Sequence, residues 1–353
     1  MSDPLVLSVL DQTPVSEGST GGDALRNTID LAQLADELGY RRYWLAEHHN
    51  GPLLAGPSPE VLIGPVAMAT SRIRVGSGGV MLPHYSPLKV AESFSVLAGL
   101  FGNRIDLAIG RAPGTDPMTT FALQRDRRQA APDDFPDQLA ELLALLEHRI
   151  PPDHPFARLS RLPGHPNIPE PWLLGSSPQS AIWAAELGLP YAFADFINPQ
   201  GAPIAAEYRA RFQDSQRLVA PHLAVAVWAI AADTDEEAHH LAASARMTMT
   251  LLRRGQLIPV PPPEKAVRFL ESEGLPIDAA PQGRRTIVGA TDTVEAGIRE
   301  VAAAYGAQEV IVVSITYDHG ARRHSYELIA EAFGLDRAPD AAPREGVASL
   351  ASK

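Results

Sequence analysis

An acid and two imidazoles stand side by side early in the chain, as Glu47-His48-His49. Imidazoles titrate near neutral pH and can donate, accept or relay a proton, so this group is suited to acid–base catalysis. It directly follows Arg42–Ala46, which we predict to be a strand. A hydrogen-bonded structural turn is the alternative, whereas a metal site is disfavoured because neither a His-Glu-x-x-His spacing nor a nearby cysteine is present. We take His48 and His49 as candidate catalytic residues.

A glycine-rich run closes the next predicted strand, Ile73–Val80, where Gly76, Gly78 and Gly79 fall within four positions. Glycines weaken a buried strand and therefore need a reason. They let the backbone approach a flat ligand closely, and they permit uncommon geometry such as a cis peptide bond without proline. A plain bulge in the wall of the sheet is the alternative.

Two further strand ends carry groups that suit an anion. Arg111 follows the predicted strand Arg104–Ile109, and its planar guanidinium matches a phosphate or a carboxylate. Gly175–Ser177 follows Trp172–Leu174 and opens a helix, where free backbone N–H groups and hydroxyls gather. A surface salt bridge and a simple helix cap are the alternatives. Together the two segments indicate one phosphate-bearing ligand held across adjacent loops.

The elements that position these groups alternate between short β-rich runs and amphipathic helical segments, which is typical of parallel α/β proteins. The eight predicted strands are Leu5–Leu10, Arg42–Ala46, Ile73–Val80, Arg104–Ile109, Trp172–Leu174, Tyr191–Asp195, Leu223–Ala231 and Glu309–Ser314. No G-x-G-x-x-G follows the first strand, which counts against a Rossmann fold. We therefore predict a (β/α)₈ TIM barrel with its active site at the carboxyl ends of the strands.

Two segments break the alternation and are predicted to be lid insertions after strands four and seven. The first, about 112–171, is rich in Pro, Arg, Asp and His and contains one clear helix, Asp134–Leu146. The second, Leu251–Gly283, includes a proline-rich turn, and a glycine-rich approach then leads to a helix over Val294–Tyr305. We expect a single domain over residues 1–335 and a disordered tail over 336–353.

Composition excludes several classes of function. The chain of 353 residues has a formal net charge of −12, so it offers no basic field for nucleic acid or an anionic membrane. It has no cysteine, which excludes disulfides and thiolate chemistry. Every apolar stretch is interrupted well before the ~18 residues that a membrane span needs, and no secretion signal is visible. We expect a soluble, cytoplasmic protein.

The strand-end segments, in their order along the chain, resemble the bacterial luciferase-like flavin monooxygenases, especially the single-chain, non-luminescent members. The resemblance covers most of the chain. Its strongest stretches are Trp44–His49, Val75–Pro83, Leu107–Gly114 and Trp172–Ser177, with Val288–Val294 also similar. Light-emitting members carry a reactive cysteine where this chain has Gly110, so we do not expect light emission.

The resemblance implies a mechanism in which reduced FMN reacts with O₂ to form a flavin (hydro)peroxide that oxidises a small organic substrate. It implies a cis peptide at Gly78-Gly79 beneath the flavin ring and a catalytic role for His48. The cofactor-binding residues that we predict are Glu47, Ser77, Gly78, Gly79, Arg111, Gly175, Ser176 and Ser177. It also implies a separate flavin reductase and a homodimer formed by helices beside strands two and three. A deazaflavin-dependent reductase or dehydrogenase and a non-catalytic flavin-binding barrel are the alternatives.

Overall fold

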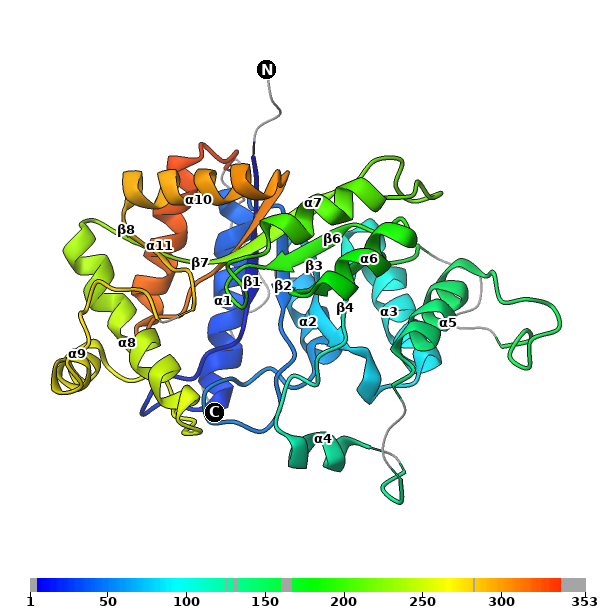
Figure 1. Ribbon diagram of the computed structural model, residues 1–353, viewed down its shortest axis with the longest axis horizontal. Coiled ribbons are helices and arrows are strands. Elements are labelled where there is room, and N and C mark those ends of the chain that lie inside the picture. The colour runs from blue at the N-terminus through cyan, green and yellow to red at the C-terminus, as the bar shows by residue number, and fades with distance from the viewer. Residues whose placement is uncertain (1–4, 125, 130–132, 160–166, 282, 338–353) are drawn as a thin grey trace.

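Eight parallel strands close into a barrel in the computed structural model, which describes residues 5–124, 126–129, 133–159, 167–281 and 283–337 (Figure 1). Hydrogen bonds join the strands in the order β1-β2-β3-β4-β5-β6-β7-β9, and β9 pairs with β1 to close the ring. The strands are β1 (Val6–Asp11), β2 (Arg42–Leu45), β3 (Arg74–Met81), β4 (Ile105–Gly110), β5 (Glu170–Gly175), β6 (Tyr191–Ala194), β7 (Leu223–Ala232) and β9 (Glu309–Val313). The predicted TIM-barrel class is confirmed.

Helices follow the strands and cover the outside of the barrel (Figure 1). They are α1 (Gly21–Leu38), α2 (Pro59–Ala69), α3 (Pro87–Phe101), α4 (Pro117–Leu123), α5 (Phe135–Glu147), α6 (Pro178–Glu186), α7 (Ala202–Arg211), α8 (Asp235–Arg253), α9 (Pro263–Ser272), α10 (Thr291–Tyr305) and α11 (His319–Ala332). Two short 3₁₀ turns flank α3. Within the described residues, no helix is long and apolar enough to cross a membrane.

Local signals explain where many helices begin and end. Thr20 caps α1 through a reciprocal hydrogen-bonded box with Asp23, and Gly39 ends the helix in the left-handed conformation that glycine adopts without steric penalty. Proline occupies the first turn of most of the other helices, where its missing N–H costs no helical hydrogen bond. The helices then bury their apolar faces against the outer faces of the strands.

The structure corrects the predicted course of the chain in three places. A ninth strand, β8 (Ile287–Ala290), lies where only a glycine-rich approach to a helix was predicted, and it pairs with Ala229–Ala232 at the end of β7. The segment between β4 and β5 contains a second helix, α4, which Asp116 caps. Helix α7 ends at Arg211, whereas the sequence pattern predicts a helix near Ile204–Gln216. The predicted tail lies outside the described residues, apart from Asp336 and Arg337.

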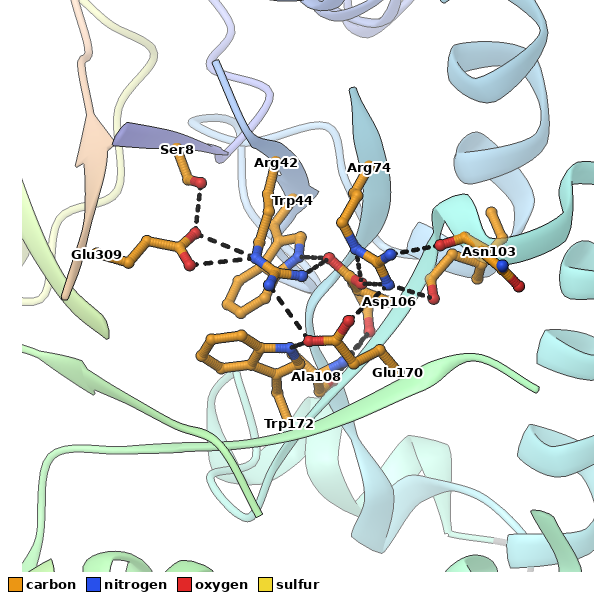
Figure 2. A network of polar contacts seen from close by, with 12 residues as sticks. Ser8, Arg42, Trp44, Arg74, Asn103, Asp106, Ala108, Glu170, Trp172 and Glu309 are labelled. Atoms are coloured by element: carbon orange, nitrogen blue, oxygen red, sulfur yellow. Dashed lines mark hydrogen bonds and ion pairs between the residues drawn. The ribbon is translucent and has the colours of Figure 1, made fainter. Parts of the chain in front are cut away.

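Charged residues close the amino-terminal end of the barrel (Figure 2). Asp106, at the start of β4, is fully buried and accepts hydrogen bonds from Arg42, Arg74 and the Trp44 indole. Arg42 also pairs with Glu170 and Glu309 at the starts of β5 and β9. Because the charged residues of this network all stand at the beginnings of strands, it joins the strands at the end opposite to the predicted active site.

Candidate functional site

A cavity of about 580 Å³ opens at the carboxyl ends of the strands. Its volume lies within the range of about 300–1,000 Å³ that is usual for small-molecule sites. Most of the candidate site residues line it, namely Glu47, His48, Gly78, Arg111, Gly175, Ser176 and Ser177. The structure thus brings together segments that lie far apart in the sequence, because the carboxyl ends of parallel strands meet at one rim.

The base of the cavity is apolar. Leu10, Trp44, Ala226 and Ile311 contribute to it from the inward faces of β1, β2, β7 and β9. Aromatic rings from outside the barrel strands, Phe135, Trp183 and Phe196, complete the lining. An apolar cavity with a few polar groups at its edge is the usual form of a site for an aromatic cofactor.

Gly78 and Gly79 lie on β3, between β2 and β4, and the peptide bond between them is cis, as the resemblance implies. A Cβ atom on Gly78 would stand 2.4 Å from a Leu10 methyl, and one on Gly79 would stand 2.7 Å from the Ala108 carbonyl oxygen. A side chain at Gly79 would therefore collide with the backbone of β4, and one at Gly78 would require Leu10 to move. Only Gly78 of this pair lines the cavity, and glycine there leaves the backbone open to a flat ligand.

Glu47 lies just after β2, is fully buried, and its carboxylate contacts three other groups. Its carboxylate lies 2.7 Å from His49 Nε2, and it accepts hydrogen bonds from the Tyr85 hydroxyl at 2.9 Å and from the Met81 N–H at 2.9 Å. His49 is consequently directed towards Glu47 and does not line the cavity. The two histidines predicted as a pair thus have different environments.

His48 lines the cavity, and its Nδ1 atom is buried without a hydrogen-bond partner in the described part of the chain. Burial, reinforced by the neighbouring His49, lowers the pKa of His48 to about 4. The imidazole is therefore neutral at physiological pH, and its enclosed Nδ1 atom has no protein partner among the described residues. An unpaired buried polar atom is expensive unless a ligand satisfies it.

Two groups near one edge of the cavity suit an anion. Arg111 is half-exposed, donates to both carboxylate oxygens of Asp133, and lies over the Trp183 ring with 5.5 Å from its guanidinium carbon to the ring centre. Ser177 caps α6, so the first backbone N–H groups of that helix face the same edge. Gly175 has no room for a side chain, because a Cβ atom would stand 2.1 Å from Ser180 Oγ.

Two other candidates take structural positions. Ser77 is buried on β3, where its hydroxyl donates to the Ala108 carbonyl and accepts from the Ala108 N–H of β4. Gly79 packs against β4 and β5. Neither residue lines the cavity. Sequence reasoning missed the aromatic lining from Phe135, Trp183 and Phe196, because these side chains lie on helices and loops whose placement no strand pattern specifies.

The known family model that matches the chain covers residues 6–325 and describes luciferase-like monooxygenases. The chain belongs to the luciferase-like monooxygenase family. Among its relatives, a luciferase-like monooxygenase of Escherichia coli K12 is 40% identical over 92% of this chain and 96% of its own. The N-acetyl-S-alkylcysteine monooxygenase of Bacillus subtilis is 37% identical over 92% of this chain and 97% of its own. Membership of this monooxygenase family makes the chain an oxidoreductase.

Solved structures agree with this assignment. The crystal structure of apo-MsnO8 is 41% identical, with a TM-score of 0.86 over 95% of this chain and 100% of its own. Two more distant structures share the fold. One is the FMN complex of the oxygenating component of 3,6-diketocamphane monooxygenase from Pseudomonas putida, at 20% identity, a TM-score of 0.69 and coverage of 93% and 97%. The other is an F420-dependent secondary alcohol dehydrogenase, at 14% identity, a TM-score of 0.64 and coverage of 94% and 99%.

Proposed function

We propose that this luciferase-like monooxygenase uses reduced FMN and O₂ to oxidise a small organic substrate. The observation that carries the proposal is the cavity of about 580 Å³, with an apolar base, an open glycine backbone and an anion-binding edge. When bound, reduced FMN supplies two electrons that reduce one oxygen atom of O₂ to water, while the other atom enters the substrate. The FMN complex of a structure with the same fold supports this choice of cofactor.

The residues present fit FMN. Gly78 leaves room for a flat ring system against β3, and Leu10 and Trp44 offer it apolar contacts. The phosphate would bind at the start of α6, to backbone N–H groups and the hydroxyls of Ser176 and Ser177. Arg111 would exchange Asp133 for the phosphate as its partner.

His48 is proposed as the residue that holds or moves a proton at its free Nδ1 atom. Its low pKa keeps the imidazole neutral, so it acts as a hydrogen-bond acceptor or base near neutral pH. His49, held by Glu47, is proposed to support His48 by keeping the end of β2 in place. His48→Ala is expected to reduce turnover by ~10²-fold or more, the usual contribution of a general acid or base. Normal turnover in that variant would limit His48 to a structural role.

The experiment that tests the proposal uses the purified chain, a flavin reductase with NADH and FMN, and ¹⁸O₂. N-acetyl-S-methylcysteine is the first substrate to try, because a relative at 37% identity is named for N-acetyl-S-alkylcysteines. We expect a product that carries one ¹⁸O atom and requires the chain. A panel of small organic substrates that yields no labelled product, together with no affinity for reduced FMN, contradicts the proposal.

A deazaflavin-dependent oxidoreductase is the second candidate, because a structure with the same fold uses F420. Anaerobic titration of the chain with reduced FMN and with reduced F420 separates the two functions. Tight binding of F420 without binding of FMN would replace the monooxygenase proposal. A non-catalytic flavin-binding barrel would leave the rate at which reduced flavin decays in air unchanged by the protein.

The proposed partners are a separate flavin reductase and a second copy of the chain. Helices α2 and α3 carry large apolar side chains that are exposed: Val61 and Met68 on α2, and Val96 and Leu100 on α3. Apolar side chains that gather on one face often mark a contact with another protein. We expect a homodimer through α2 and α3, and Met68→Glu together with Leu100→Glu is expected to yield monomers in sedimentation velocity.

A further inference from the structure

A second cavity, of about 230 Å³, lies between α8, the inward faces of β7 and β8, and the segment 277–281. It has no lining residue in common with the larger cavity. Apolar side chains make up most of its wall, including Ile230, Ile277, Val288, Val313 and Ile315. Its volume is below the usual range for drug-sized ligands, so it suits a small molecule or one end of a larger one.

The two cavities are neighbours along the direction of β7 and β9, because alternate side chains of these strands line first one cavity and then the other. Ala226 and Ile311 line the larger cavity, whereas Trp228 and Val313, two residues further along the same strands, line the smaller one. Residues two apart in a strand point to the same face and lie about 6.6 Å apart. The Trp228 ring also stacks on Phe196 of the larger cavity, with 5.9 Å between the ring centres. The smaller cavity is thus adjacent to the proposed flavin site, towards the mouth of the barrel.

Two residues that line the smaller cavity each carry an enclosed N–H donor without a partner among the described residues. Arg246, on α8, is only 8% exposed, and its Nε lacks an acceptor, although another guanidinium N–H donates to the Pro276 carbonyl. Trp228 is 9% exposed, and its indole N–H is likewise unpaired. Burial lowers the pKa of Arg246, although the nearby Asp278 carboxylate acts in the opposite direction. Among the described residues no carboxylate forms a close ion pair with Arg246, and a buried cation without one is destabilising, so a bound anion would stabilise it.

We propose that the smaller cavity binds the carboxylate of a small, largely apolar monocarboxylic acid, and that such acids are the substrate class of the enzyme. Arg246 and the Trp228 indole would donate to the carboxylate, and the apolar remainder would extend along Ile230 and Val313 towards the flavin site. This inference rests on the proposed monooxygenase function.

The charges around the cavity favour a single negative charge on the ligand. Arg246, His239 and Asp278 are the titratable residues in the lining. One guanidinium balances one negative charge, whereas a phosphate ester would bring nearly two charges close to the carboxylate of Asp278. Asp278 is exposed at the rim and lies near enough to act electrostatically on Arg246, so it also disfavours a dianion.

The test compares hexanoate with its neutral analogue hexanamide by isothermal titration calorimetry on the full chain without flavin. Hexanoate is expected to bind about 10- to 100-fold more tightly, as for hydrogen bonds to a charged group. Arg246→Gln is expected to abolish that difference, and Arg246→Lys to restore part of it. Trp228→Phe, which keeps the ring and removes the N–H, is expected to weaken hexanoate by about 3- to 10-fold.

Arg254→Gln provides the matched control, because Arg254 follows α8 but pairs with Glu273 on the surface. It is expected to bind hexanoate like the native chain. Equal affinity of the native chain for acid and amide, or native hexanoate affinity in Arg246→Gln, would overturn the inference. If Arg246→Gln fails to fold, the comparison of acid and amide and the Trp228→Phe variant decide the question.

Two further measurements separate this inference from the proposed function. Arg246→Gln is expected to bind reduced FMN like the native chain, because Arg246 does not line the larger cavity. Failure of the native chain to bind reduced FMN would count against the proposed function alone, since the calorimetry contains no flavin. With an active substrate, hexanoate is expected to raise KM without changing kcat. Inhibition that lowers kcat alone would show that the cavity does not hold substrate.

Discussion

The two ends of the barrel differ in whether their buried polar groups have hydrogen-bond partners. At the amino-terminal end, the network in Figure 2 gives every buried side-chain nitrogen and oxygen of its labelled residues a partner. At the carboxyl-terminal end, His48 Nδ1, Arg246 Nε and the Trp228 indole N–H have none in the described part of the chain. The barrel therefore has one end where the charged network is satisfied within the protein, and another end where some buried polar atoms near the cavities lack a protein partner. This division is the one expected of TIM-barrel enzymes.

The largest effect on stability is expected at the amino-terminal end of the barrel. Asp106→Asn removes the fully buried carboxylate that Arg42 and Arg74 share, so that Arg74 keeps only the partly exposed Glu170 as an ion-pair partner. Breaking a buried ion pair by removing one partner costs about 3–5 kcal/mol. Urea denaturation should show this loss in the free energy of unfolding. Glu295→Gln, which removes an exposed partner of Arg299, is the control and is expected to cost less than about 1 kcal/mol. An Asp106→Asn loss no greater than the control would contradict the contrast between the two ends.

The second prediction distinguishes the two ends of the barrel by the pH range in which each one loses stability. The pKa of His48 is about 4 in the folded chain, against 6.5 for an ordinary solvated histidine, so the unfolded chain binds this proton more readily. His48 therefore makes stability fall as pH decreases from about 6.5 to about 4, by up to about 3 kcal/mol. We expect His48→Gln to flatten that part of the curve, whereas His154→Gln, which changes a histidine outside both cavities, leaves it intact.

Glu309, at the amino-terminal end of the barrel, affects stability at a lower pH than His48 does. Burial alone would raise its pKa, but Arg42 and the hydrogen bonds from His222 and Ser8 hold the pKa at about 2. Its contribution to stability is therefore present above pH 4.5 and is lost as pH falls towards 2. Unfolding measured by circular dichroism across both windows should show two separate losses. A single loss below pH 4.5 would mean that His48 is solvated in the folded chain.

The smallest effect is expected at the edge of the larger cavity, where a charged pair is exposed. Arg111→Ala is expected to weaken the binding of reduced FMN by about 1.5–3 kcal/mol, because it removes a charge-assisted contact to the phosphate. Asp133→Asn removes the group that competes for Arg111 and is expected to tighten binding by less than about 1 kcal/mol. Anaerobic fluorescence titration measures both. Unchanged affinity in Arg111→Ala would assign the phosphate to the α6 start alone.

The sequence was sufficient to predict the barrel and the rim because both depend on local patterns. Alternating strands fix the parallel order, and the residues just after each strand, such as Arg111 and Gly175, must then meet. It did not predict β8, because Ile287–Ala290 is only four residues long, contains a glycine and is stabilised by pairing with β7. It did not single out Arg246 either. An arginine within a long helix normally faces solvent, and only the packing of α8 over β7 and β8 buries it.

The attachment of β8 to the rest of the molecule has a consequence for local motion. Strand β8 is hydrogen-bonded to the barrel along one edge, through the last four residues of β7. Opening these few pairs requires much less free energy than unfolding the closed ring. Backbone amides of β8 should therefore exchange with deuterium through local fluctuations, while those in the middle of the barrel strands exchange only when the whole domain unfolds. Because β8 also forms a wall of the smaller cavity, that cavity can admit its ligand while the rest of the barrel stays closed.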